Sequence, residues 1–300
     1  MSATDVSARA TSGRATQSRN ESPTAGSDKV VTVVSHIVLT IWSIIVILPL
    51  LWVFLSSWKT TREIFDSPFA LPQTWSFDNY VGAWTDSGIG KYMLNSVIVV
   101  GCSLVLVMIL GAAAAYTLAR FTFFGSQIVY YLILAGLTFP IFLAIVPLFF
   151  VLKNLGLLNT LPGLIATYVA FAFPFTVFFL YPFFRGLPSE IAEAAELDGA
   201  GEWRTFFQVM LPMARPGIVA IAIFNFLGLW NQFLLPVALN TNEDNYVLSQ
   251  GMARFASQAG YAVDFGQLFA AVVITIVPVL AVYIFTQRQL QGSLSQGTMK

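Results

Sequence analysis

The side chains best suited to polar chemistry are concentrated in one segment, Arg185–Arg215, which reads RGLPSEIAEAAELDGAGEWRTFFQVMLPMAR. It holds five of the 15 acidic residues of the chain: Glu190, Glu193, Glu196, Asp198 and Glu202. Carboxylates form charge-assisted hydrogen bonds with basic side chains and backbone N–H groups. The sequence has no P-loop, no H-E-x-x-H pair, no metal-spaced Cys/His cluster and no G-x-S-x-G turn. The segment therefore predicts polar contacts, and no residue pattern predicts catalysis or a metal site.

The first half of this segment predicts a short helix. It begins near Pro188 or Ser189, because a first-turn proline or a serine cap is favoured there. It ends at Gly199, since glycine readily takes the left-handed conformation of a helix end. One side of the helix is predicted to carry Ile191, Ala194 and Ala195, and the carboxylates available for polar contacts are Glu190, Glu193 and Asp198.

The second half predicts an amphipathic helix that ends at Pro212. Its apolar face carries four residues at the i, i+3, i+4, i+7 spacing: Trp203, Phe206, Phe207 and Met210. A first helix of small and acidic residues binds lipid poorly and suits a contact with another protein. From the residues alone two interpretations stay open: a docking element for a partner, or an interfacial helix packed under a membrane bundle.

The elements that position this segment follow from the distribution of charge. Charged residues make up 10% of the chain, against about 25% in a soluble domain. They are confined to islands between six charge-free stretches: Val30–Trp58, Tyr92–Ala119, Phe121–Leu152, Asn154–Phe184, Pro216–Asn242 and Phe265–Gln287. Each stretch exceeds the length of about 20 residues that a helix needs to cross a bilayer. A soluble globule is excluded, and the zero net charge gives no indication of nucleic-acid binding.

The predicted fold is an all-α polytopic membrane bundle of six transmembrane helices, one per stretch, with residues 185–215 as a cytoplasmic loop. Apolar runs without alternation, such as Val97–Leu110, exclude barrel strands. Prolines within the stretches remove backbone donors and predict kinks or breaks in the helices. These prolines are Pro49, Pro140, Pro147, Pro174, Pro182, Pro236 and Pro278.

The lysines and arginines predict the orientation in the cell inner (plasma) membrane. With the N-terminus inside, the inner segments carry ten of the 15 basic residues and the outer segments carry five. This bias predicts that both termini are cytoplasmic. The polar residues 1–29 predict a disordered tail, residues 30–287 form the six-span domain, and residues 288–300 form a second cytoplasmic tail. Cys102 is the single cysteine, so an intrachain disulfide is excluded.

The spans lack the groups that a self-powered transporter uses. Secondary carriers usually bury charged side chains or histidines as coupling sites. The only such residue in the six stretches is His36, near the predicted cytoplasmic end of the first, and it is interpreted as an interfacial histidine. The energy that drives this protein is therefore expected to come from another chain. A self-contained secondary carrier or channel is the alternative interpretation.

A family resemblance rests on the spacing of Glu193-Ala194-Ala195, Gly199, Val209 and Leu211-Pro212. This spacing resembles the EAA loop of bacterial ABC importer permeases, EAA-x3-G-x9-I-x-LP, with Val209 in place of Ile. The strings PSEIAEAAELDGA, AAAYTLARFTFFG and LKNLGLLNT resemble the carbohydrate-uptake permeases, in particular those similar to the smaller permease subunit of the maltose transporter. The resemblance covers roughly residues 30–300.

The resemblance implies a permease subunit, not itself an enzyme, of an ATP-binding-cassette importer. It implies a second homologous permease that completes the path of a mono- or oligosaccharide, and an extracellular sugar-binding protein or lipoprotein. It also implies two identical ATPase subunits, which use ATP and Mg, so no cofactor is expected on this chain itself. The sequence does not identify the sugar.

The same resemblance assigns roles to particular segments. Ser189–Gly201 is expected to sit in a cleft of the ATPase, and the coupling residues are Glu190, Glu193, Ala194, Ala195, Asp198, Gly199, Ala200 and Pro212. The outer loops Trp58–Lys91 and Leu239–Asp264 are expected to dock the binding protein. The tail Arg288–Lys300 either reaches the ATPase or is a frayed end.

The fifth stretch carries the candidate substrate path: Asn225, Trp230, Asn231 and Gln232. Counted from Pro216, a helix places Asn225 about 13 Å deep, near the middle of the membrane. Amides can hydrogen-bond to sugar hydroxyls, and an aromatic ring can cover the C–H face of a sugar. The same amides can instead bond to neighbouring helices, and both interpretations stay open.

Overall fold

The computed structural model describes residues 25–257 and 264–297, all of them in helices or in loops between helices. The chain divides into two compact units, Met1–Leu51 and Trp52–Lys300. Helix α1 (Ala25–Ser56) begins inside the predicted N-terminal tail, and its residues up to Leu51 form the described part of the first unit. The rest of that tail, residues 1–24, lies outside the described residues. The predicted all-α class is confirmed.

Four helices of the described chain are long and apolar enough to cross a membrane without a break. They are Val30–Ser56 of α1, α4 (Ile89–Arg120), α7 (Leu161–Arg185) and Phe265–Gln287 of α14 (Phe265–Gly297). Two further spans are sharply bent pairs: α5 (Ser126–Thr138) with α6 (Ile141–Asn154), and Glu202–Met213 with α11 (Arg215–Trp230). Counting each pair as one span gives up to six. One helix per charge-free stretch is therefore wrong for the third stretch, Phe121–Leu152.

The third stretch breaks at Pro140. Helices α5 and α6 meet at an angle of 106°, and Phe139 between them is extended, with φ −75° and ψ 118°. A residue before proline is disfavoured in the α conformation, and proline has no N–H for the helical hydrogen bonds. The single helix predicted for Phe121–Leu152 is wrong, but the predicted break at a proline is confirmed here. Five other predicted prolines lie inside helices: Pro49, Pro147, Pro174, Pro182 and Pro278.

The fifth stretch breaks after Trp230, where α11 ends, and a short helix α12 (Leu234–Leu239) follows. In a continuous helix, Pro236 could not donate to the carbonyl of Gln232, and its ring would clash with that carbonyl. The Gln232 carbonyl instead accepts a hydrogen bond from Ser249 Oγ at 2.8 Å. The single helix predicted for Pro216–Asn242 is therefore wrong.

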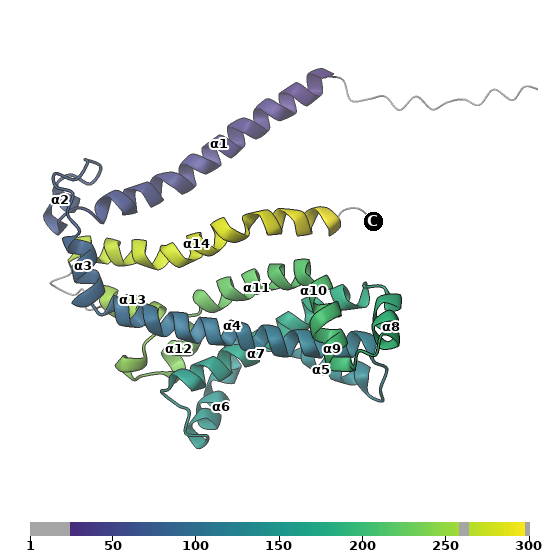
Figure 1. Cartoon of the computed structure of the whole chain (residues 1–300). Coiled ribbons are helices and arrows are strands. Elements are labelled where there is room, and N and C mark those ends of the chain that lie inside the picture. The colour runs from purple at the N-terminus through teal and green to yellow at the C-terminus, as the bar shows by residue number, and fades with distance from the viewer. Residues whose placement is uncertain (1–24, 258–263, 298–300) are drawn as a thin grey trace, which may run out of the picture. The chain divides into compact units, whose positions relative to one another are not determined.

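Helices α4 and α7 form the most extensive helix pair of the second unit and run alongside each other (Figure 1). Small residues let their backbones approach, as is common between membrane helices. A Cβ atom added to Gly111 would lie 2.5 Å from Cγ2 of Thr176. The buried residues around this contact are Ala112, Ala115, Val177 and Leu180. This pair is the scaffold on which residues 185–215 and α11 are built.

One group of short helices lies at one end of the second unit, and α8 (Ser189–Leu197) lies at the other (Figure 1). The short helices are α2 (Thr61–Asp66), α3 (Asp78–Thr85), α12, the 3-10 helix η2 (Glu243–Asn245) and α13 (Leu248–Ser257). Apart from part of α12, they come from the predicted outer loops. The loop predicted to be cytoplasmic and the loops predicted to be external are therefore at opposite ends of the bundle.

Helix α14 packs against α3 and α11 and continues past the predicted domain boundary at Gln287 as far as Gly297. The described part of the predicted C-terminal tail is therefore helical. Residues 298–300 lie outside the described residues.

Candidate functional site

The predicted coupling helix is present as α8. Pro188 caps it and Glu190 lies in its first turn, where a negative charge is favoured by the helix dipole. Gly199 follows the helix with a φ of +79°, so its N–H can bond to the carbonyl of Glu196 at 2.9 Å and the Ala200 N–H to that of Ala195 at 2.9 Å. These two bonds make a Schellman end, which needs a left-handed residue at this position. Both predicted helix ends are confirmed.

One side of α8 packs on the protein and the other side is exposed. Ile191, Ala192 and Ala195 are half-buried, and α8 contacts the segment that follows it. Ala194, which was predicted to share one side of the helix with Ile191 and Ala195, is exposed. The exposed side is acidic at its edges and apolar at Leu197, which is 89% exposed. The exposed candidates are Glu190, Glu193, Ala194, Asp198 and Gly199, whereas Ala200 is half-buried.

The second half of the loop is a helix with a π-helical centre: α9 (Glu202–Arg204), η1 (Thr205–Met210) and α10 (Leu211–Met213). The Leu211 N–H bonds to the carbonyl of Phe206, five residues back. Pro212 lies inside the last turn, and the helix ends at Met213. The observed end is one residue beyond the predicted end at Pro212, a difference within the usual uncertainty of helix boundaries.

The π segment also divides the predicted apolar face. Phe206 and Met210 are buried, at 4% and 0% exposure, whereas Trp203 is 74% exposed and Phe207 47% exposed. The Trp203 and Phe207 rings stack on each other with centroids 6.1 Å apart. A face at a period of 3.6 residues cannot persist through a turn that is wider than an α-helical turn. The loop therefore presents Trp203 and Phe207 outward, together with Leu197.

An aromatic cluster connects the loop to the helix pair. The ring of Phe206 lies 5.0 Å from that of Tyr116 in α4 and 6.3 Å from that of Phe184 in α7. Arg120, at the end of α4, donates a hydrogen bond from Nη2 to the carbonyl of Leu187, just before α8. The loop is thus fixed on the ends of α4 and α7, and it leads directly into α11.

The predicted substrate-path residues are brought together only in part. Asn225 is 5% exposed and donates from Nδ2 to Thr176 Oγ1 in α7 at 2.8 Å. Trp230 stacks on Phe226, with ring centroids 5.7 Å apart. Asn231 is exposed and donates back to the carbonyl of Leu227 at 2.8 Å. Asn225 therefore bonds to a neighbouring helix, as the second interpretation expects, whereas Asn231 bonds back to its own helix α11.

A cavity of about 240 Å³ lies between α7, α11 and α12, and two of the predicted residues line it, Asn225 and Gln232. Its other polar lining residue is Tyr168, which the sequence analysis missed. The remaining lining residues are Ile141, Phe171, Ala172, Phe175, Phe224, Gly228, Leu229 and Leu235. The missed signal is the i, i+4, i+7 spacing of Tyr168, Ala172 and Phe175, which puts a tyrosine on an otherwise apolar helix face.

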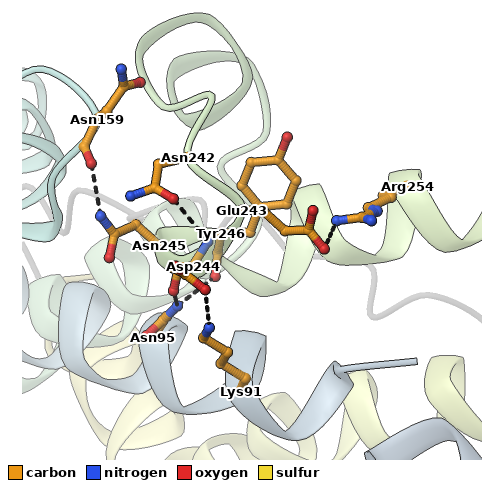
Figure 2. Close-up of polar contacts among 9 residues, drawn as sticks. All are labelled: Lys91, Asn95, Asn159, Asn242, Glu243, Asp244, Asn245, Tyr246 and Arg254. Carbon is orange, nitrogen blue, oxygen red and sulfur yellow. Dashed lines mark hydrogen bonds and ion pairs between the residues drawn. The ribbon is translucent and has the colours of Figure 1, made fainter. Parts of the chain in front are cut away.

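The outer loop Leu239–Asp264 is fixed to the bundle by polar contacts (Figure 2). Figure 2 shows Lys91 of α4 directed at Asp244, and Arg254 of α13 directed at Glu243. Asn95 donates from Nδ2 to the carbonyls of Asp244 and Tyr246, at 3.0 and 2.9 Å. The hydrogen bond from Lys91 and its positive charge lower the pKa of the Asp244 carboxyl.

The outer loop Trp58–Lys91 is organised by buried groups. Lys59 is 1% exposed and donates from Nζ to the carbonyls of Ser67 and Pro68, at 3.1 and 3.0 Å. Glu63 closes a capping box with Thr60 at the start of α2. The described residues contain no group of three or more His, Cys, Asp or Glu side chains placed to hold a metal.

The structure combines spanning helices, a cavity between two of them and an exposed loop on the helix pair α4 and α7. This arrangement is typical of a membrane transport component. Residues 107–294 match the family model described as "Binding-protein-dependent transport system inner membrane component". The chain belongs to this family. The match includes all of residues 185–215, both helices that enclose the cavity and the outer loop of Figure 2.

Similar curated proteins are permeases of sugar transport systems. The diacetylchitobiose uptake system permease protein NgcG of Streptomyces coelicolor is 66% identical over 276 residues, which cover 92% of this chain and 91% of that protein. The trehalose transport system permease protein SugB of Mycobacterium tuberculosis is 32% identical over 254 residues, covering 85% and 92%. These matches confirm the predicted class, a permease of an ABC importer, and make the chain a multi-pass inner membrane protein.

A solved structure shares the fold. A bacterial ABC transporter involved in the import of the acidic polysaccharide alginate contains a chain that matches with a TM-score of 0.76 at 20% identity, covering 87% of this chain and 97% of that one. A second structure, of a bacterial alginate ABC transporter in complex with an alginate pentasaccharide-bound periplasmic protein, matches with a TM-score of 0.66. The likeness confirms the predicted membrane-bundle fold.

Proposed function

We propose that this chain is a permease subunit of an importer for an N-acetylated disaccharide of the diacetylchitobiose type. The observation that carries the substrate is the 66% identity, over 92% of the chain, to a diacetylchitobiose uptake permease. Relatives at 30–33% identity are named for other sugars, among them trehalose, sulfoquinovosyl glycerol and arabinooligosaccharides. Family membership supports a sugar in general, and the much higher identity to one relative supports this particular sugar.

The translocation path lies between this chain and a second homologous permease. The cavity lined by Asn225 and Gln232 supports a contribution of this subunit, because it opens between spanning helices rather than being closed within the core. Trp230 and Asn231 follow at the end of α11, near the external side. The cavity lies beside the break after Trp230, so part of its wall is non-helical backbone. Membrane proteins tolerate non-helical backbone where it lines a cavity.

A separate ATPase docks on the exposed side of α8. Leu197 and Trp203 are 89% and 74% exposed, and a pair of exposed large apolar side chains next to carboxylates suits a protein contact. The coupling surface consists of Glu190, Glu193, Ala194, Asp198, Leu197 and Trp203. ATP and Mg are bound and used by two copies of the ATPase, not by this chain.

Movement of the ATPases reaches the membrane through the aromatic cluster. Phe206 packs between the ends of α4 and α7, and η1 leads through α10 into α11. The bend of 79° between Glu202–Met213 and α11 means that a push on the loop turns α11 about its inner end. Because α11 carries Asn225, this rotation alters the cavity.

In this arrangement both termini and α8 are cytoplasmic, and α2, α3, α12 and α13 face the outside. The outer loops dock an extracellular sugar-binding protein. The contacts of Lys91 with Asp244 and of Arg254 with Glu243 support this role, because they hold the outer loop in one shape (Figure 2).

The test is uptake of labelled diacetylchitobiose into proteoliposomes that contain this chain, the second permease and the ATPase, with the binding protein added outside. Uptake is expected only with ATP inside and binding protein outside. Glu193→Lys and Gly199→Trp are expected to abolish uptake while the complex still assembles. Glu193→Lys reverses a charge on the docking side, and Gly199→Trp places a large side chain on a left-handed residue.

The matched control is Lys153→Glu, a charge reversal of an exposed residue in the last turn of α6, outside residues 185–215 and outside both docking loops. It is expected to leave ATP-coupled uptake unchanged. Normal coupled uptake in both loop variants would contradict the docking role of α8. Uptake of another disaccharide in preference to diacetylchitobiose would contradict the proposed substrate.

A further inference from the structure

Tyr168 is a buried side chain whose hydroxyl has no hydrogen-bond partner among the residues that the structure describes. It is 2% exposed, on the face of α7 that lines the cavity of about 240 Å³. Within the described part of the chain no residue forms a hydrogen bond with its hydroxyl. Buried tyrosine hydroxyls usually have a hydrogen-bond partner, and an exception in a folded protein requires an explanation. A ligand in the cavity would supply the missing partner.

Two more polar groups border the same cavity. Asn225 is held by the hydrogen bond from its Nδ2 to Thr176 Oγ1 at 2.8 Å, so its Oδ1 is left as an acceptor in a fixed orientation. Gln232 lies just beyond the end of α11, where its backbone carbonyl is held by Ser249. The cavity therefore offers a hydroxyl that can donate, an amide oxygen that can accept, and a second amide that can do either.

The rest of the lining is apolar and aromatic, chiefly Phe171, Phe175 and Phe224. Pockets that hold a whole drug-sized ligand measure about 300–1,000 Å³, so a cavity of about 240 Å³ suits one part of a disaccharide. A sugar ring face with several hydroxyls would leave most of them unpaired against the phenylalanines, which is costly. The occupant should have one acceptor, one donor and an apolar end.

An acetamido group has this composition: a carbonyl oxygen, an N–H and a methyl group. We propose that the cavity binds the acetamido group of an N-acetylhexosamine, with the Tyr168 hydroxyl donating to the carbonyl oxygen and Asn225 Oδ1 accepting from the N–H. The methyl group packs among the phenylalanines. This assignment rests on the proposed function, and it makes Tyr168 a specificity-determining residue of this subunit.

The position of the cavity suits the entry of a sugar from outside. Tyr168 lies seven residues after the start of α7 at Leu161, and Asn225 lies five residues before the end of α11 at Trp230. At 1.5 Å per residue these side chains are about 10 Å and about 8 Å from the external ends of their helices. Both side chains are therefore nearer the proposed external ends of α7 and α11 than the cytoplasmic ends.

The test measures equilibrium binding of diacetylchitobiose and of chitobiose, which lacks both acetyl groups, to the purified complex of permeases and ATPase. The wild-type complex is expected to bind the acetylated sugar more tightly. Tyr168→Phe is expected to weaken binding of the acetylated sugar about three- to tenfold, the range of one neutral hydrogen bond, and to leave chitobiose binding unchanged. Because none of the described residues bonds to the hydroxyl, the thermal unfolding midpoint of the variant should equal that of wild type.

The matched control is Tyr283→Phe, which removes a hydroxyl from an exposed tyrosine of α14 away from the cavity. It should change the binding of neither sugar. The assignment is overturned if Tyr168→Phe binds both sugars as wild type does, if it weakens both equally, or if the wild-type complex does not discriminate between them. ATP-driven uptake of diacetylchitobiose by wild type is a separate readout, so the proposed function can stand where the cavity assignment fails.

Discussion

Asn225 of α11 and Thr176 of α7 are joined by a buried hydrogen bond of 2.8 Å between Nδ2 and Oγ1. Thr176 is 0% exposed, and its hydroxyl donates in turn to the carbonyl of Ala172 at 2.9 Å. The amide that the sequence suggested for sugar contact therefore ties two helices together with its nitrogen and can face the cavity only with its oxygen. The hydrogen bond agrees with the helix-bonding interpretation, and the proposed sugar contact would use the oxygen of the same side chain.

Thr176→Val should destabilise the protein by about 1–2 kcal/mol, because it leaves the Asn225 amide without its oxygen acceptor while preserving the shape of the side chain. A hydrogen bond between membrane helices stabilises the folded protein by about 0.6 kcal/mol on average. A loss of stability larger than this would come from leaving the Asn225 amide buried without a partner. The measurement is the free energy of unfolding in detergent. Thr176→Ser, which keeps the hydroxyl, is the control, and equal losses in the two variants would show that the hydrogen bond contributes nothing.

Gly111→Ala should destabilise the protein by about 1–3 kcal/mol, the usual cost of overpacking. The added Cβ would lie 2.5 Å from Cγ2 of Thr176, so α4 and α7 would have to separate. Gly101→Ala on the same helix is the control, since nothing lies within 4 Å of its added Cβ. That substitution should be neutral or stabilise the helix by about 0.5–1 kcal/mol. Similar unfolding midpoints for the two variants would rule out close packing at Gly111.

The capping box of α2 should open in acid. The backbone N–H of Thr60, 2.8 Å from Glu63 Oε2, holds the pKa of this carboxyl below its ordinary value, and the N–H of Gln73 acts in the same direction. A carboxyl whose pKa is lowered by folding contributes stability that is fully present above its ordinary pKa. That stability is lost as the pH falls through the lowered value.

Hydrogen exchange of the Thr60 and Gln73 amides, corrected for intrinsic rates, measures this opening. Their protection should be constant near neutral pH and fall below the ordinary glutamate pKa of 4.5. Glu63→Gln keeps a capping side chain but does not ionise in this range. Protection should therefore be lower in the variant and independent of pH, and the same acid-induced loss in both proteins would show that Glu63 is not the titrating group.

The parts of the structure that the sequence predicts are those with a local cause. Gly199 ends α8 because glycine tolerates a φ of +79°, and Pro140 breaks the third stretch because it lacks an N–H. Both causes are visible in one or two residues. The break after Trp230 has a cause that is less local, because Pro236 acts four residues back and Ser249, in another element, satisfies the freed carbonyl of Gln232.

The parts of the structure that the sequence does not predict depend on contacts between helices. In the loop, Phe206 packs on Tyr116, whereas Trp203 and Phe207 stack on each other and point outward. The predicted apolar face assumed 3.6 residues per turn, and the π segment does not have this period. Tyr168 looks like an interfacial or core aromatic in the sequence. Only the arrangement of α7 against α11 shows that its hydroxyl borders a cavity.

Phe206→Ala should therefore be the most disruptive change in the loop. Phe206 is 4% exposed between the rings of Tyr116 and Phe184, so its removal leaves a cavity and costs about 3–5 kcal/mol of unfolding free energy. The next residue provides the control: Phe207 is 47% exposed, and Phe207→Ala should cost far less. Comparable losses would mean that the π segment does not separate the two side chains. If the cluster transmits ATPase movement to α11, the milder Phe206→Leu should also lower sugar uptake per ATP hydrolysed, because the loop would move without turning α11 fully.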